Sequence, residues 1–518
     1  MALWLSLVAV AVSARGAEAE APTVARFDVL EFRVEGNTVL PSERIERAVY
    51  PFMGELRTVD DVESARVALE AAYRDAGYGT VLVDTPEQKI TDGVVTLQVV
   101  QAPVSRLRVV GARYYSQGRI LSKVPALAEG QVPNFKEVTA QLGTVNRSAD
   151  RRVTPLLRPG KEPGTTEVDL MVEDKRPLHG SVELNNKASA NTTPARLQAS
   201  LRYDNLWQRE HSISAQVQVS PQKTSEVRVF SGSYTVPVGQ GLIVYSATRS
   251  NSNTVASVGG TTVFGLGSIF GVRGVMPLHS DERLSQTLTL GADYKDFKES
   301  VSVGANQGFD TPVHYLPFSA SYSASLLDAR GSWQAGGGVV LALRGVGSNE
   351  SQFADKRYKA QSNFSVFKLN ASRSENLPKG MTLYGALEGQ LSDQPLISNE
   401  QFVAGGVDSV RGYLDASAVG DKAVRGSIEL RSANLAPQGH AWLGGLRVLA
   451  FAEGAALWLK SPLPGQDDRF GLLSAGIGLR AQARERAVLS LDLGLPLRDS
   501  GPTLKGDWRL HASGVLEF

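Results

Sequence analysis

The sequence predicts a membrane β-barrel of about sixteen antiparallel strands, preceded by two α+β domains. The first observation behind this prediction is the end of the chain, residues 508–518, where apolar and polar side chains alternate strictly. A period of two gives a strand one apolar and one polar face. A tilted strand of roughly ten residues also suffices to cross an outer membrane. The chain ends on an aromatic residue, Phe518, at the end of this strand.

The second observation is that the same alternation recurs throughout residues 177–518, which we predict to form the barrel. These segments are longer than a usual globular strand and are separated by clusters of turn-forming residues. At about twenty residues per strand and turn, some sixteen strands fit, and no helix is predicted among them. A soluble β-sandwich also alternates, but its dry core could not accept so polar an inner face, so we expect a lumen that contains water. The clearest predicted strands are 195–203, 213–219, 288–294, 473–481 and 487–495.

The third observation is a pair of similar units ahead of the barrel, residues 26–101 and 102–176. In each unit the pattern predicts one strand, two helices and two further strands. The first unit opens with a predicted strand over 27–34, and the second places its helices near 116–124 and 134–146. The shared order of elements predicts a structural repeat, although the two units have little sequence identity.

Composition and charge exclude several classes of protein. The chain has 518 residues, no cysteine, and 54 basic against 53 acidic residues. A nucleic-acid binder would usually have a basic excess, and the lack of cysteine excludes disulfides and thiolate metal sites. The six histidines lack the spacing of metal ligands, and no GxSxG or phosphate-loop motif is present. We therefore predict a protein that is not an enzyme, with no catalytic residue, metal or cofactor; an enzyme site built from distant residues is the alternative.

Residues 1–19 are expected to be a secretory signal peptide. An apolar run over 3–12 is too short to span a membrane as a helix, and the small-x-small sequence Ala17-Glu18-Ala19 follows it. The usual positive charge before the run is missing, so a buried N-terminal strand or helix is the alternative. No later segment offers eighteen uncharged apolar residues, and an exported membrane protein without such segments crosses lipid as a barrel.

The strongest local motif is a glycine-rich segment, residues 405–413, that contains Val410, Arg411, Gly412 and Tyr413. Read alone, it could be a solvated loop. With the two preceding units and the terminal Phe518, however, the chain resembles the two-partner secretion transporters (TpsB). These are the FhaC/ShlB/HecB-like haemolysin secretion/activation proteins of the Omp85 superfamily. Further matching segments are Tyr73-x-x-x-Gly77-Tyr78, Pro86-x-Gln88, Asp92-Gly93, Asn146-Arg147, Pro159-Gly160 and the R-x-x-x-E-L-R strand at 425–431.

The resemblance implies that units 26–101 and 102–176 are POTRA domains and that the VRGY loop folds back into the barrel. It also implies that Arg411 pairs with an acidic residue on an inward-facing F-x-D-x-G strand. The matching positions are Phe451 and Glu453, which share one strand face. This sequence has Glu453 where the family has aspartate and Ala455 where the family has the last glycine. The negative charge is therefore kept, while the geometry of the site differs from the family pattern.

Many members also carry an N-terminal helix that plugs the pore. Here too few residues lie between Ala19 and Phe27 for such a helix and its linker. We therefore expect closure to depend on the VRGY loop or on other extracellular loops.

The resemblance implies a monomeric outer-membrane pore with periplasmic POTRA domains. The pore would recognise a partner exoprotein of the haemolysin, adhesin or haemagglutinin type and move it to the cell surface without nucleotide hydrolysis. The main alternative is an Omp85-type factor that assembles or inserts outer-membrane proteins, whose members often carry three or five POTRA domains. A passive porin would leave the two POTRA domains unexplained.

Overall fold

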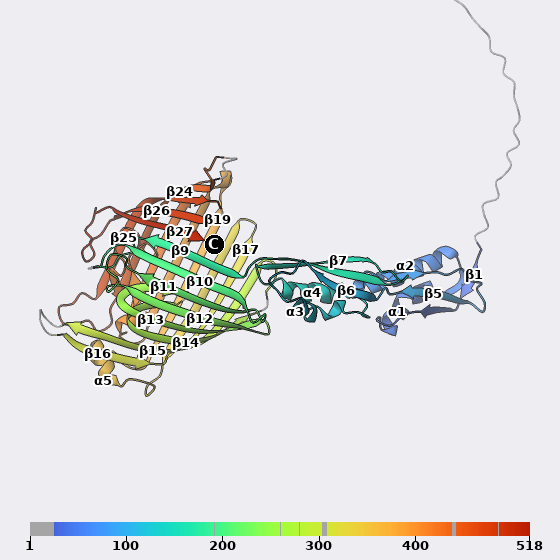
Figure 1. Cartoon of the computed structure of the whole chain (residues 1–518), viewed down its shortest axis with the longest axis horizontal. Helices are drawn as coiled ribbons and strands as arrows, with labels where there is room; N and C mark the ends of the chain where they lie inside the picture. The colour runs from blue at the N-terminus through green and yellow to red at the C-terminus, as the bar shows by residue number, and fades with distance from the viewer. Residues whose placement is uncertain are drawn as a thin grey trace, which may run out of the picture. The chain divides into compact units, whose positions relative to one another are not determined.

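The computed structural model describes residues 25–518 except 191, 259–260, 279, 303–307, 438–441 and 485. The predicted signal peptide, residues 1–19, lies outside the described residues. The chain divides into two compact units, with the division between Arg176 and Pro177. Figure 1 shows the first unit in blue to teal and the second as a ring of tilted strands in green to red. No helix in the described part of the chain is both long and apolar enough to cross a membrane.

The first domain of unit 1 packs two helices against small sheets. The prediction of a single strand over 27–34 is wrong. The chain bends at Leu30, because the N–H groups of Leu30 and Glu31 both donate to the carbonyl oxygen of Gly93. As a result β1 pairs with β3, while β2 runs parallel to β5. The elements are β1 (Phe27–Val29), β2 (Glu31–Glu35), α1 (Ser42–Val49), β3 (Gly54–Arg57), α2 (Val59–Ala76), β4 (Leu82–Asp84) and β5 (Val94–Val100).

The second domain of unit 1 has the predicted order of strand, two helices and two strands. Its sheet has the order β6-β8-β7, with β6 parallel to β8. The N–H group of Phe135, at the start of α4, donates to the carbonyl oxygen of Gly77 at the end of α2, which joins the two domains. The elements are β6 (Val104–Val110), α3 (Gln117–Ser122), α4 (Phe135–Val145), β7 (Arg151–Pro159) and β8 (Thr166–Asp174).

A buried tyrosine should give unit 1 an alkaline limit of stability. The hydroxyl of Tyr73 donates to Oδ1 of Asn37 at 2.7 Å, and burial raises the pKa of Tyr73 to about 12. This pKa lies above the value of about 10 in the unfolded chain. The stability that the neutral hydroxyl contributes is therefore fully present below about pH 10, and it is lost as the pH rises through 12. Tyr73→Phe should therefore lower the free energy of unfolding by about 1 kcal/mol at pH 8. The variant should also lose less stability than the wild type as the pH rises above about 10.

Thermal unfolding of the full chain in detergent, followed by the helical circular dichroism signal, measures both effects. The exposed Tyr50 provides the control variant, Tyr50→Phe. An unchanged melting temperature for Tyr73→Phe would contradict the assigned role of the hydroxyl.

The second unit is a closed antiparallel barrel, as predicted. β16 and β17 both pair with β15 and are separated by Leu316 and Pro317, so they occupy one strand position. Counted this way, the described residues form a ring of sixteen strand positions, which β27 closes by pairing with β9. The strands are β9 (Leu178–Asn185), β10 (Arg196–Leu206), β11 (His211–Val219), β12 (Arg228–Val238), β13 (Gly241–Val258), β14 (Thr261–Pro277), β15 (Leu284–Ser302), β16 (Gly308–Tyr315), β17 (Phe318–Asp328), β18 (Gly331–Ala342), β19 (Phe364–Asn376), β20 (Thr382–Ser392), β23 (Lys422–Arg431), β24 (Leu443–Trp458), β25 (Arg469–Ala483), β26 (Ala487–Pro496) and β27 (Arg509–Glu517).

The terminal strand confirms the alternation from which the fold was predicted. Its apolar residues, such as Leu510 and Leu516, point outward and are more than half exposed, whereas His511 is buried inside the ring. The N–H and carbonyl oxygen of Phe518 bond to the backbone of Gly180, and the Phe518 ring lies where a side chain at residue 180 would be. The C-terminal aromatic residue therefore helps to close the barrel.

The prediction that residues 177–518 contain no helix is wrong. Helix α5 (Glu350–Lys356) lies between β18 and β19, at the barrel end opposite to Leu178, which we call the far end. The helix has seven residues and a capping box formed by Asn349 and Gln352, so it is too short to show helical periodicity in the sequence.

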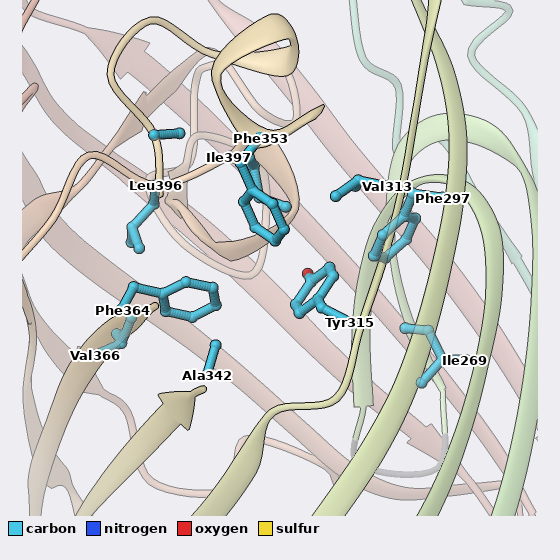
Figure 2. Packing of buried hydrophobic residues seen from close by; sticks show 11 residues of the cluster. Ile269, Phe297, Val313, Tyr315, Ala342, Phe353, Phe364, Val366, Leu396 and Ile397 are labelled. Carbon is cyan, nitrogen blue, oxygen red and sulfur yellow. The ribbon is translucent and has the colours of Figure 1, made fainter. Parts of the chain in front are cut away.

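Helix α5 contributes to an apolar cluster, so the lumen is not polar throughout. Phe353 of α5 packs edge-on against Tyr315, whose ring also contacts Phe364 (Figure 2). Leu396 and Ile397, from the segment that follows β20, complete this far-end cluster (Figure 2). Its buried members are Ile269, Phe297, Val313, Tyr315, Ala342, Phe353, Ala360, Phe364, Val366, Leu396 and Ile397.

Candidate functional site

The segment between β20 and β23 returns into the barrel and carries the predicted motif. Within it, β21 (Phe402–Ala404) pairs with β22 (Ala418–Gly420), and we call residues 402–420 the inner hairpin. Gly405, Gly406 and Gly412 have φ values of 109°, 94° and 93°, which L side chains rarely adopt. These glycines give the hairpin tip the sharp turns that aim Arg411 at the barrel wall.

Arg411 is 3% exposed and contacts three buried carboxylates. Its Nη2 lies 2.6 Å from Glu453 and 2.5 Å from Glu429, its Nη1 lies 3.0 Å from Asp492, and its backbone N–H donates to Glu453 at 2.8 Å. The guanidinium also lies 3.6 Å from the ring centroid of Phe451. The structure thus brings together Arg411, Phe451 and Glu453, and it adds Glu429 and Asp492.

Two further arginines balance the charge of this cluster. Arg431 contacts Glu429 at 2.7 Å, and Arg480 contacts Asp492 at 2.8 Å. Three carboxylates therefore face three guanidinium groups, which is the condition under which buried charges are tolerated. Loss of the central guanidinium would leave buried negative charge without a partner.

The backbone of the hairpin tip fits closely against β26 and β27. The N–H of Gly412 donates to Nε2 of His511 at 2.9 Å. A β-carbon on Gly494 would lie 2.5 Å from the nitrogen of Gly412, so only glycine permits this approach. The hydroxyl of Tyr413 donates to the carbonyl oxygen of Arg498 at 2.8 Å. These contacts do not depend on the charge of Arg411.

The remaining predicted residues lie in a small apolar cluster. Val410 and Tyr413 are fully buried there, and the methyl group of Ala455 belongs to the same cluster. The alanine that replaces the family's glycine therefore packs near the hairpin instead of displacing it. The buried members are Ala404, Val410, Tyr413, Ala418, Ala423, Ala455, Leu457 and Leu472.

The base of the inner hairpin is tied to the opposite wall and to the far-end loops. Buried Glu400 accepts from Nζ of Lys295 at 2.5 Å and from the hydroxyl of Tyr315 at 2.6 Å. Fully buried Asp421 binds both terminal nitrogens of Arg357, at 3.1 and 2.9 Å. The Asp421–Arg357 pair thus links the hairpin to the segment that follows α5.

Sequence reasoning missed Glu429, Asp492 and His511. They come from β23, β26 and β27, which belong to one stretch of the barrel wall and meet the hairpin tip only when residues 402–420 fold back into the lumen. The signal available in the sequence was their inward position on alternating strands, for example Asp492 among outward-facing leucines. That signal identifies residues that face the lumen, but it does not identify which of them meet Arg411.

Comparison with known proteins shows the family to which this barrel belongs. Residues 164–481, more than half of the chain, match the family of haemolysin secretion/activation proteins ShlB/FhaC/HecB. The chain belongs to the ShlB/FhaC/HecB family. Residues 27–102 match the ShlB-type POTRA domain. The protein is thus a member of the two-partner secretion transporters, in agreement with the resemblance drawn from its motifs.

Individual relatives in this family are outer membrane transporters named CdiB. The protein from Dickeya dadantii (strain 3937) is 23% identical over 455 residues, which are 83% of this chain and 76% of the relative. The protein from Escherichia coli O6:K15:H31 (strain 536 / UPEC) is 26% identical over 231 residues, 43% of this chain and 38% of that relative.

Solved structures share the fold. CdiB from Escherichia coli superposes with a TM-score of 0.66 at 21% identity, covering 97% of this chain and 93% of that chain. BamA from Haemophilus ducreyi lacking POTRA domains 1–3 gives a TM-score of 0.57 at 15% identity, covering 95% and 100%. The ShlB/FhaC/HecB family member described here thus shares the barrel fold of these two structures.

These relationships place the barrel in the outer membrane with the POTRA domains in the periplasm. Strand β9 begins at Leu178, directly after unit 1, so that end of the barrel is periplasmic. Successive strands alternate in direction, and the far end is therefore extracellular. The inner hairpin enters the lumen from the cell surface side.

Breaking the Asp421–Arg357 pair should loosen the extracellular end. Asp421→Asn removes the charge that holds Arg357 and the N–H groups of Leu396 and Lys460. Arg357 is only 16% exposed, and breaking a largely buried ion pair by removing one charge is strongly destabilising, so we expect the far-end cluster to open. Cells that produce the variant should become several-fold more sensitive to vancomycin, which intact outer membranes exclude. Asp468→Asn, an exposed change in the loop between β24 and β25, is the control; equal sensitivity of the two strains would contradict the assigned role.

Proposed function

We propose that this protein is the outer-membrane pore that captures a partner exoprotein of the haemolysin, adhesin or haemagglutinin type in the periplasm and exports it to the cell surface. The observation that carries this proposal is the inner hairpin, docked inside a barrel of this family through Arg411 and three buried carboxylates. Such a hairpin narrows the lumen and is held by buried contacts at its tip and at its base, which suits a controlled conduit better than an open porin.

In this proposal the POTRA domains bind the unfolded partner before it enters the barrel. β2 and β6 are edge strands of their sheets, and an edge strand can add an extended chain through backbone hydrogen bonds. Such binding tolerates varied sequence. A closed ring made from a single chain supports a monomeric transporter.

Export is proposed to proceed without nucleotide hydrolysis. The sequence has no phosphate-loop motif, and the periplasm contains no ATP. Folding of the partner outside the cell would then pull the chain through, because a process that removes the unfolded state shifts the equilibrium.

Deletion of the gene tests the proposed function against the alternative role in outer-membrane protein assembly. We expect one or a few large polypeptides to disappear from the culture medium, as measured by mass spectrometry, while the amounts of other outer-membrane proteins stay constant. Broad loss of outer-membrane proteins with an unchanged medium would instead show an assembly factor. Complementation with the wild-type gene is the control.

A further inference from the structure

A polar cavity of about 580 Å³ lies beside the inner hairpin. Its wall comes from β9–β11, from β15 and from β19–β20, and its remaining side is the hairpin itself, including Asp408 and Asp415. None of its lining residues comes from β23–β27, the strands that hold Arg411. The tip of the hairpin therefore has two different sides: one is fixed to the wall that holds Arg411, and the other faces the cavity. The base of the hairpin is held to β15 and β16 through Glu400.

The side of the hairpin that is fixed to the wall offers no passage. Tyr413 and Leu457 are fully buried in the apolar cluster between the hairpin and the wall. Near β14–β19, the far-end cluster around Tyr315 and Phe353 fills the space with apolar side chains (Figure 2). A chain that left the periplasmic lumen would thus meet packed side chains in both places. The polar cavity lies between them and borders the far-end cluster at Glu400, whose carboxylate accepts from the hydroxyl of Tyr315.

The lining of the cavity fits one class of ligand. Seven of its residues are asparagine or glutamine, and its charged residues are three lysines and four carboxylates. A primary amide offers both donors and an acceptor, as a peptide group does. An ion path would instead carry charges of one sign, and a site for an apolar ligand would have an apolar lining. Amides together with mixed charges suit the main chain of an extended polypeptide, whatever its sequence.

On this side two contacts join the hairpin to the segment that follows β9: the N–H of Asp415 donates to the carbonyl oxygen of Ala188 at 2.9 Å, and an ion pair spans the cavity. Nζ of Lys187 lies 2.8 Å from Asp408, whose side chain is 76% exposed. Exposed ion pairs contribute little, so this contact can part without disturbing the buried contacts of Arg411.

Building on the export function proposed above, we infer that the secreted chain passes beside the docked inner hairpin, through this cavity, in an extended conformation. Gln198 and Gln218, which are direct neighbours across β10 and β11, form part of its path. The hairpin then acts as one wall of the conduit and does not have to leave the barrel for export.

The lack of cysteine in the chain allows a direct test by disulfide capture in cells. The substrate is the polypeptide that the deletion strain fails to release, carrying one cysteine and a folded domain that stalls it in the pore. Gln198→Cys and Gln218→Cys should each form a disulfide with the stalled chain. Ser474→Cys is a near-isosteric change in β25, beside Glu453, where the residue is 1% exposed. This variant should give at least ten-fold less disulfide-linked product.

The outcomes separate the inference from the function on which it rests. Capture at residue 474, or at none of the three positions while export continues, would overturn the inference and leave the function standing. If deletion removes no polypeptide from the medium, the proposed function fails first.

A second measurement uses apolar substitutions on the same two strands. Gln198→Leu combined with Gln218→Leu should slow release of the substrate about ten-fold, because the amide pair is lost from the path. Ala199→Leu combined with Ala215→Leu, on the lipid-facing side of β10 and β11, should leave release unchanged. Unchanged release by the glutamine double variant would overturn the inference.

Discussion

Arg411→Ala is expected to reduce export of the partner more than ten-fold while the barrel still reaches the outer membrane. The change leaves Glu429, Glu453 and Asp492 buried with one central positive charge missing. Removing one partner from a buried ionic group typically costs about 3–5 kcal/mol, which is enough to release the hairpin from the wall. The strand pairs of the ring do not involve the Arg411 side chain, so barrel closure should persist. Export is measured as the amount of partner in the medium, and assembly as heat-modifiable migration of the barrel.

Two variants give this prediction its controls. Arg469→Ala removes a guanidinium at the start of β25 that is 76% exposed and lies 3.8 Å from the exposed Asp468, and it should change export less than two-fold. Arg411→Lys keeps the charge but cannot reach three carboxylates with a fork of donors, so intermediate export is expected. Normal export by Arg411→Ala would show that docking of the hairpin is irrelevant to transport.

Gly494→Val is expected to cause a similar loss of export with every charge in place. A side chain on Gly494 would collide with the backbone of Gly412, at 2.5 Å from its nitrogen and 2.8 Å from its Cα. Because both atoms belong to backbone, neither can swing away, and the hairpin tip must rise from β26. Trypsin added to intact cells should then cut at the released tip, which wild-type cells protect.

Gly385→Val is the matched control for this variant. Gly385 lies in β20, and a β-carbon there would meet no atom within 4 Å. Export and protease resistance should both remain at the wild-type level. If Gly494→Val also behaves as wild type, then the close approach of Gly412 and Gly494 is not needed for function.

Much of the fold could be predicted because it follows from a local rule. In a barrel that spans lipid, each strand must alternate, so the sequence from residue 177 onward shows where strands lie and which way side chains face. The same rule placed Phe451 and Glu453 on the inward face of β24. Two short features could not be predicted from this alternation. Helix α5 has too few residues for a helical period, and the break at Leu30 depends on the distant carbonyl of Gly93.

The composition of the candidate site was less predictable. Arg411 and Glu453 could be named because a motif links them, whereas Asp492 and His511 meet Arg411 and Gly412 only because the inner hairpin folds back onto β26 and β27. Long-range pairing of this kind leaves no periodic trace in one sequence. The far-end cluster was missed for a related reason, since its apolar residues occupy inward positions at which polar residues were expected.

Reconstitution tests most directly whether this barrel alone moves a polypeptide. The purified transporter is placed in liposomes, and the unfolded partner, identified from the deletion strain, is added on the POTRA side without nucleotide. We predict that the partner becomes protected from added protease in the vesicle interior, and that Arg411→Ala liposomes give at least ten-fold less protection. A partner that stays fully digestible with the wild-type transporter, or that needs added ATP, would contradict export by this pore.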